Sequence, residues 1–182
     1  MTASDRQRFP PKPVTLKDGR AATVRFLLAD DGPRLGEFYE RCDNNAKRFY
    51  YPHDLDREHA LANAARADSP MEVVLLLVTP DGRVGGYAWY RWRDPKAETS
   101  GFGICIAPDF QSCGAGRLIM ERVLEVAHEV GPPRMHLSCQ HANFRAVELY
   151  QKLGFRVTRE TMIRARRGWP AEPEYWMERA VR

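Results

Sequence analysis

Apolar residues follow two different periods along this chain, and each change of period marks a new element. Short apolar or alternating runs at residues 22–29, 71–93 and 102–107 are typical of strands. Pro80-Asp81-Gly82 is a turn signal inside the second run, so residues 71–93 are predicted to form a hairpin. Pro108 ends the third run.

Helical spacing of apolar residues predicts four helices. In residues 114–130, for example, Ile119, Val123 and Val126 share one face. The other helices are expected at residues 30–42, 56–67 and 143–154. The remaining strands are expected at residues 134–139, 155–167 and 174–181, and residues 44–55 are expected to be an aromatic loop.

This order of elements indicates one mixed α/β (α+β) domain. Its sheet should be twisted, mostly antiparallel and built of about seven strands, with about four flanking helices and a βαβ unit in the middle. We place the domain at residues 20–182. Residues 1–19 are rich in prolines and charges and are predicted to be a mobile N-terminal leader.

Composition excludes several classes of protein. The 182 residues have no apolar run near the roughly 20 residues of a membrane span. They also begin with no apolar signal segment, so a cytoplasmic location is expected. The net charge of +4 is too mild to indicate nucleic acid. Much of the excess lies in residues 156–167, as either a solvated strand face or an electropositive wall beside an anionic ligand.

Cysteine and histidine spacing does not predict a metal site. The four cysteines form no CxxC pair and are expected to be free thiols. The segment His136–His141 includes Cys139, but residues three apart on a strand face opposite sides. We therefore expect no bound metal.

The loop Gln111-Ser112-Cys113-Gly114-Ala115-Gly116 joins a predicted strand to a predicted helix. Helix N-termini leave backbone N–H groups unpaired, and glycines let an anion approach them. The motif lacks the Gly-Lys-Ser/Thr of a Walker loop and the third glycine of a dinucleotide loop. By itself, the loop is equally compatible with an anion site and with a tight turn that binds nothing.

Two blocks together resemble the GNAT N-acetyltransferase superfamily. Gln111-x-x-Gly114-x-Gly116 resembles the family's acetyl-CoA signature. Downstream, the segment from Asn143 to Phe155 resembles its "N…A…LY…LGF" block. Residues 14–35 also resemble the entry to GNAT domains of some bacterial protein-lysine acetyltransferases.

The resemblance implies acetyl-CoA as co-substrate and a role for each matching residue. Asn143 would hydrogen-bond near the pantetheine, besides being the expected helix N-cap. Tyr150 would act as general acid to the leaving thiolate, although its pattern alone suits a core aromatic. The remaining cofactor contacts would come from Ile104, Cys105 and Ile106 to the pantetheine arm, and from Gln111, Ser112, Cys113, Gly114, Ala115, Gly116 and Arg117 to the pyrophosphate.

The general base is the point where the sequence departs from the family. Many relatives have a glutamate early in the strand before the loop, where this chain has Gly101-Phe102-Gly103. Glu98, His136 and a water chain are the alternatives.

We therefore predict direct acetyl transfer to a primary amine of a small molecule or a peptide. The aromatic segments 47–55 and 87–92 should wall the acceptor site. A homodimer is compatible with the sequence, whereas no nucleic-acid or membrane partner is expected. The alternative function is an acyl-CoA-binding or regulatory module that keeps the fold but has lost turnover.

Overall fold

The computed structural model describes residues 3–182, which contain one eight-stranded sheet. The strand order is β1-β2-β3-β4-β5-β6-β8-β7. Neighbouring strands are antiparallel except β5 and β6, which are parallel. The strands are β1 (Lys12–Thr15), β2 (Ala21–Phe26), β3 (Glu72–Val78), β4 (Val84–Arg91), β5 (Thr99–Ile106), β6 (Arg134–Gln140), β7 (Arg156–Ile163) and β8 (Glu172–Ala180).

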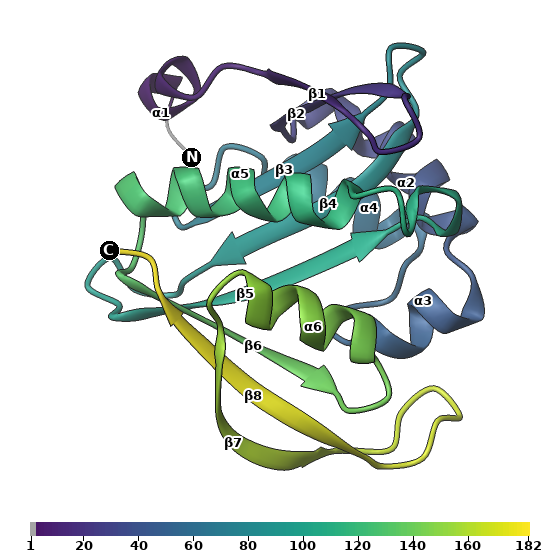
Figure 1. Cartoon of the computed structure of the whole chain (residues 1–182). Helices are drawn as coiled ribbons and strands as arrows, with labels where there is room; N and C mark the ends of the chain where they lie inside the picture. Colours follow the sequence, from purple (N-terminus) through teal and green to yellow (C-terminus); the bar gives the residue numbers. More distant parts are fainter. Residues whose placement is uncertain (1–2) are drawn as a thin grey trace.

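Helices cover both faces of the sheet. In Figure 1, α5 and α6 lie over the near face, and α2 and α4 lie behind it. The helices are α1 (Ala3–Arg8), α2 (Gly32–Arg41), α3 (Asn44–Phe49), α4 (Arg57–Ala65), α5 (Ala115–Glu129) and α6 (Phe144–Lys152). Short 3₁₀ turns, η1 (Ala29–Asp31) and η2 (Pro108–Phe110), precede α2 and α5. No helix within residues 3–182 is long and apolar enough to cross a bilayer.

The core lies between the central strands and the helices. Every residue of β3 is buried, as a strand covered on both faces should be. The predicted stripe of α5 is buried, with Ile119, Val123 and Val126 fully enclosed. These apolar contacts hold β5 and the N-terminus of α5 in a fixed relation, and that relation positions the site.

The sheet begins earlier than expected. Residues 12–15 form β1, which pairs with β2 from Lys12–Val24 to Thr15–Ala21. This strand raises the count to eight and lies in the segment expected to be a leader. It is short, mostly exposed and contains Pro13, so it had no apolar signal, and an edge strand tolerates its proline. The first two residues of that segment lie outside the described residues.

Another difference is α3, which replaces the first part of the expected aromatic loop. The Asp43 carboxylate caps it by accepting a 2.8 Å hydrogen bond from the Ala46 N–H. No residue of α3 is buried, so its sequence has no apolar stripe from which the helix could be predicted. The loop after it, residues 50–56, carries Tyr50, Tyr51 and His53.

Candidate active site

A gap opens between β5 and β6, the only parallel pair of the described sheet. The strands pair at three positions, from Thr99–Arg134 to Gly101–His136, and no further pair joins them among the described residues. Beyond Gly101, β5 is therefore hydrogen-bonded only on its β4 side. Ile104, Cys105 and Ile106 lie in this open part, so an extended ligand can pair with them as an added strand.

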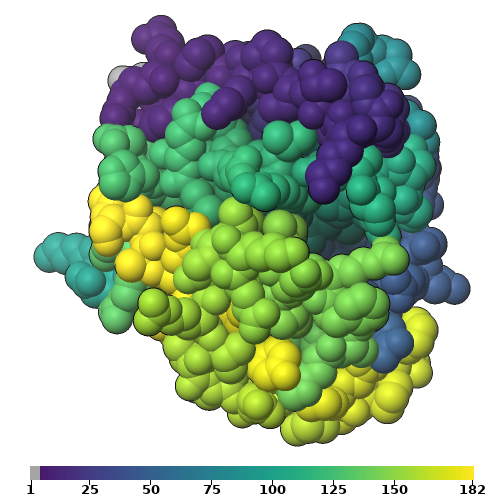
Figure 2. All heavy atoms as spheres, in the orientation of Figure 1, coloured from purple at the N-terminus to yellow at the C-terminus, as the bar shows by residue number. Residues whose placement is uncertain are grey.

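The loop before α5 lies at the open end of the gap. Ser112 and Gly114 both have left-handed backbones, with φ of 61° and 87°. No well-formed hydrogen bond leads from the N–H groups of residues 112–117 to another group of the described chain. Alternating backbone conformations of this kind, followed by a helix N-terminus, create a concave anion site. In Figure 2 the surface is hollowed between this loop and α6.

The side chains of the loop are largely tied down or turned outward. Gln111 Nε2 donates to the Ile106 carbonyl at 3.4 Å, and Cys113 Sγ donates to the Phe110 carbonyl at 2.9 Å. Arg117 forms an exposed ion pair with Glu121. Ala115 is buried. Main-chain groups therefore dominate the surface that the loop presents.

The β1–β2 turn adds cations that the sequence analysis missed. The Lys17 N–H donates to the Cys113 carbonyl at 2.8 Å. A Cβ placed on Gly114 would lie 3.3 Å from Lys17 Cγ, so the lysine side chain passes directly over the loop. Arg20 donates to the Asp109 carbonyl at 2.9 Å and stacks on Phe110. No local signal links these residues to the loop, because about 90 residues separate them in sequence.

The end of α6 fixes the position of Tyr150. Gly154, with φ of 84°, donates to the Gln151 carbonyl, and the Phe155 N–H donates to the Tyr150 carbonyl at 3.0 Å. This pair of bonds is a Schellman motif, in which the residue after the glycine packs back on the helix. The Phe155 ring lies 5.9 Å from the Tyr150 ring, and Phe102 makes an edge contact with it at 6.3 Å.

In the described part of the chain, the Tyr150 hydroxyl and the Asn143 side-chain amide are not used in hydrogen bonds that hold α6 in place. Within residues 3–182 the Tyr150 hydroxyl has no hydrogen-bond partner, and burial raises the pKa of its phenol well above the usual value. Asn143 precedes α6, but its side chain does not cap the helix as expected. The helix start instead uses the Asn143 carbonyl, which accepts from Ala146 and Val147.

Packing on the opposite face of the gap accounts for the glycines that stand where many relatives have a glutamate. A side chain at Gly101 or Gly103 would lie on the opposite face of β5 from the Phe102 side chain and would face Trp89 on β4. A Cβ on Gly103 would lie 2.5 Å from the Trp89 indole. The indole therefore occupies the space that a side chain at this position would need.

Trp89 starts a hydrogen-bonded chain that leads to the surface. Its Nε1–H donates to the Tyr50 hydroxyl at 2.8 Å, and this hydroxyl lies 3.0 Å from His53 Nε2. His53 Nδ1 lies 2.8 Å from the Asp54 carbonyl, which can only accept. Nδ1 therefore holds the proton, and the Tyr50 hydroxyl donates to Nε2. Burial lowers the pKa of His53 to about 4 and keeps it neutral.

His136 lies where the strands diverge, and Glu98 does not. His136 pairs with Gly101, stacks on Trp176 at 4.7 Å, and has Nε2 3.8 Å from a Cβ placed on Gly101. Burial lowers its pKa below the usual value. Glu98 is exposed before the start of β5, about 23 Å along the strand from Cys105. The structure thus brings His136, but not Glu98, to the gap.

Known proteins resemble this chain in sequence and in fold. The L-amino acid N-acyltransferase MnaT of Escherichia coli is 26% identical over 139 residues, which cover 75% of this chain and 80% of MnaT. The GNAT domain of S. lividans PAT has a TM-score of 0.77 at 20% identity and covers 99% of both chains.

A second solved structure has a similar fold. It is that of yncA from Salmonella typhimurium with its cofactor acetyl-CoA, with a TM-score of 0.74 at 22% identity; the match covers 88% of this chain and 94% of the other. At these identities the structural likenesses show the fold. The model of the acetyltransferase (GNAT) family matches residues 34–155.

Proposed function

The chain belongs to the GNAT family of acetyltransferases, and we propose that it moves an acetyl group from acetyl-CoA directly to a primary amine. The divergence of β5 and β6 beside Tyr150 carries this proposal. The open edge of β5 would pair with pantetheine, and the N–H groups of residues 112–117 would hold the pyrophosphate. Asn143, whose side chain is not used as a cap, would bond to the pantetheine arm.

Tyr150 is the proposed general acid. The phenol of this buried residue lies on the α6 side of the gap, and its raised pKa keeps it protonated at neutral pH. Phe102 and Phe155 hold its ring on two sides. A positioned and protonated phenol is what a departing thiolate requires.

His136 is the proposed general base. It lies on the other face of the gap, toward Trp89, and its lowered pKa leaves it neutral and able to accept a proton at neutral pH. In the reaction, the amine nitrogen bonds to the thioester carbon and gives a proton to His136. The carbon–sulfur bond then breaks, and the thiolate takes the Tyr150 proton. Free N–H groups of β5 are available to the oxyanion between these steps.

Two measurements test the enzyme against a non-catalytic acyl-CoA-binding module. Calorimetry measures acetyl-CoA binding, and a thiol assay measures CoA release with a panel of amines, corrected for release without amine. We expect binding and amine-dependent release. Binding without release from any amine would favour the binding module, and absence of binding would contradict both functions.

A cytoplasmic location and a homodimer stay predictions. Cell fractionation tests the first and light scattering of the purified chain tests the second.

A further inference from the structure

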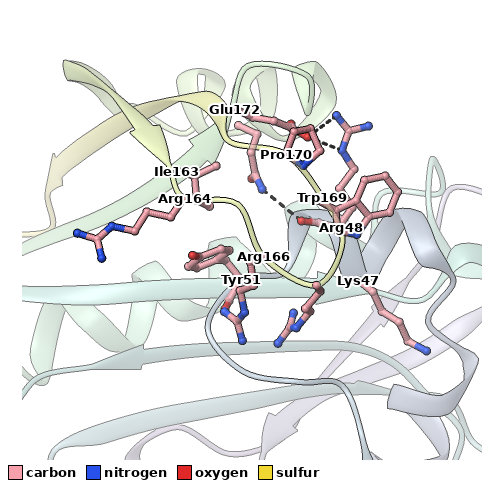
Figure 3. Close-up of a pocket in the computed structure, with 11 residues that line it drawn as sticks. Lys47, Arg48, Tyr51, Ile163, Arg164, Arg166, Trp169, Pro170 and Glu172 are labelled. Atoms are coloured by element: carbon pink, nitrogen blue, oxygen red, sulfur yellow. Dashed lines mark hydrogen bonds and ion pairs between the residues drawn. The ribbon is translucent and has the colours of Figure 1, made fainter.

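A cationic cleft lies between α3 and the loop that joins β7 to β8. Figure 3 shows Arg166 beside the ring of Tyr51, with Lys47 and Arg164 extending outward on the two sides. Arg48 is stacked on Trp169 at 5.1 Å. The cleft is lined by Lys47, Arg48, Tyr51, Gln140, Ile163, Arg164, Arg166, Arg167, Trp169, Pro170 and Glu172.

Positive charge is in excess in this cleft. Its five cations face two carboxylates, Glu172, which pairs with Arg48 at 2.7 Å, and Asp54, which pairs with Arg166 and Arg167. Burial and the neighbouring Arg166 lower the pKa of Arg167. Two guanidinium groups share one exposed carboxylate here, so a further anion would relieve their repulsion.

Hydrogen-bond donors are also left over. Arg166 donates to the Tyr51 carbonyl, and Arg167 donates to the Tyr50 carbonyl at 3.0 Å. Each guanidinium has five N–H donors, so these contacts with the chain leave several unused. Lys47 and Arg164 have no ion pair among the described residues.

The cleft lies at the end of β6, on the face of the sheet that carries His136. Gln140, which lines it, is the last residue of β6, and alternation along the strand places it on the same face as His136. Four residues of strand separate them by about 13 Å. Tyr51 follows Tyr50, whose hydroxyl bonds to Trp89 above Gly103. An acceptor can therefore have its amine at the gap and its far end in the cleft.

We propose that the acceptor is an amine that carries an anionic group, a carboxylate or a phosphate, several bonds away, and that this cleft binds the anionic group. The inference rests on the proposed function and adds the substrate class. Of the two interpretations of the arginine-rich segment, it selects the electropositive wall beside an anionic ligand for Arg164, Arg166 and Arg167. A polyamine would place a second cation among five others, which opposes its binding.

Matched pairs of acceptors test the proposal. β-Alanine, γ-aminobutyrate and ε-aminocaproate are each compared with their amides, and 5-aminopentyl phosphate with 5-aminopentanol, in the thiol assay with the full chain. We expect kcat/KM about tenfold higher for ε-aminocaproate than for its amide, as for a charge-assisted hydrogen bond, whereas β-alanine is too short to reach the cleft and should show little preference over its amide. The preference should grow with chain length in the carboxylate series and shrink at high salt. The pair with the larger ratio distinguishes carboxylate from phosphate.

Charge-removing variants locate the effect. Lys47→Gln combined with Arg164→Gln leaves the contacts of Arg167 and Arg166 to Tyr50 and Tyr51 intact and should reduce the preference for the anionic acceptor several-fold. Arg93→Gln removes an exposed cation from the β4–β5 loop and should keep the wild-type preference. If the double variant and Arg93→Gln change the preference for the anionic acceptor equally, the cleft does not bind the anionic group.

Failure of this inference differs from failure of the proposed function. If neutral amines or polyamines release thiol as well as the anionic amines do, the substrate class is wrong and the acetyltransferase stands. If no amine releases thiol, the acetyltransferase itself is contradicted.

Discussion

The two faces of the gap between β5 and β6 differ in which parts of the chain form them. The α6 side consists of main chain and one helix end, from residues 104–117 and 143–155. The opposite side consists of side chains from distant segments, with Tyr50, Trp89 and His136 as examples. Main-chain groups can bind a constant ligand whatever the side chains are, whereas side chains can differ for each acceptor. Cofactor binding and acceptor choice are therefore separable in this protein.

Tyr150→Phe should have the largest effect and should affect only the chemical step. Loss of a general acid lowers kcat by about two to four orders of magnitude. The ring contacts with Phe102 and Phe155 remain, so the acetyl-CoA Kd measured by calorimetry should stay close to that of the wild type. An unchanged kcat would remove Tyr150 as the acid.

Gly114→Val should instead weaken cofactor binding. Gly114 has φ of 87°, and a side chain there meets Lys17 and covers the N–H groups of the loop. We expect the acetyl-CoA Kd to rise about a hundredfold, equivalent to about 2.7 kcal/mol.

Gly82→Val is the matched control, with φ of 84° in the β3–β4 turn. Both variants pay the same left-handed strain of about 1–2 kcal/mol, so their thermal stabilities should fall alike. Equal loss of affinity in both would contradict the anion site.

His136→Gln tests the acceptor face through pH. The wild-type base has a pKa below the usual 6.5, so it is fully available above that pH. As the pH falls through its pKa the imidazole becomes protonated, and kcat/KM should fall. The variant should lose this acidic limb and show kcat lower by about a hundredfold, the lower end of the contribution of a general base. If kcat/KM of the variant still falls at acidic pH, the fall is caused by another titrating group, such as His53.

Gly103→Ala sharpens the explanation for the absent acid. Its Cβ would lie 2.5 Å from Trp89, so overpacking should destabilise the fold by about 1–3 kcal/mol in chemical denaturation. At Gly101 the corresponding distance is 3.6 Å, an ordinary contact, and Gly101→Ala should cost much less. Similar losses in the free energy of unfolding for Gly103→Ala and Gly101→Ala would show that the Trp89 indole moves to make room.

Lys17→Gln should have the smallest effect. The side chain adds one exposed cation to a site made mainly of N–H groups, so the acetyl-CoA Kd should rise only several-fold, and its salt dependence should weaken. Lys96→Gln, in the β4–β5 loop, is the control and should change neither. A salt dependence as steep as that of the wild type would place Lys17 outside the site.

Local sequence patterns predicted the elements on the cofactor side because short-range physics controls them. Gly154 ends α6 by its left-handed backbone, and the next residue, Phe155, packs on Tyr150. Gly114 and the apolar stripe of α5 similarly mark where a loop becomes a helix. The family resemblance then assigned roles to these positions. Strand β1 escaped prediction because an exposed edge strand needs no apolar alternation.

The acceptor side could not be anticipated in the same way. Nothing in the segment around Gly103 reveals that the Trp89 indole lies over it, or that Tyr50 and His53 continue from that indole. Nor does the arginine-rich segment reveal that Arg167 lies against the carbonyl of Tyr50. Helix caps and turns depend on neighbours a few residues away, so the chain alone specifies them. Contacts between different strands and loops, up to 117 residues apart for Arg167 and Tyr50, depend on sheet register and on how loops pack, and these exist only once the whole sheet has formed.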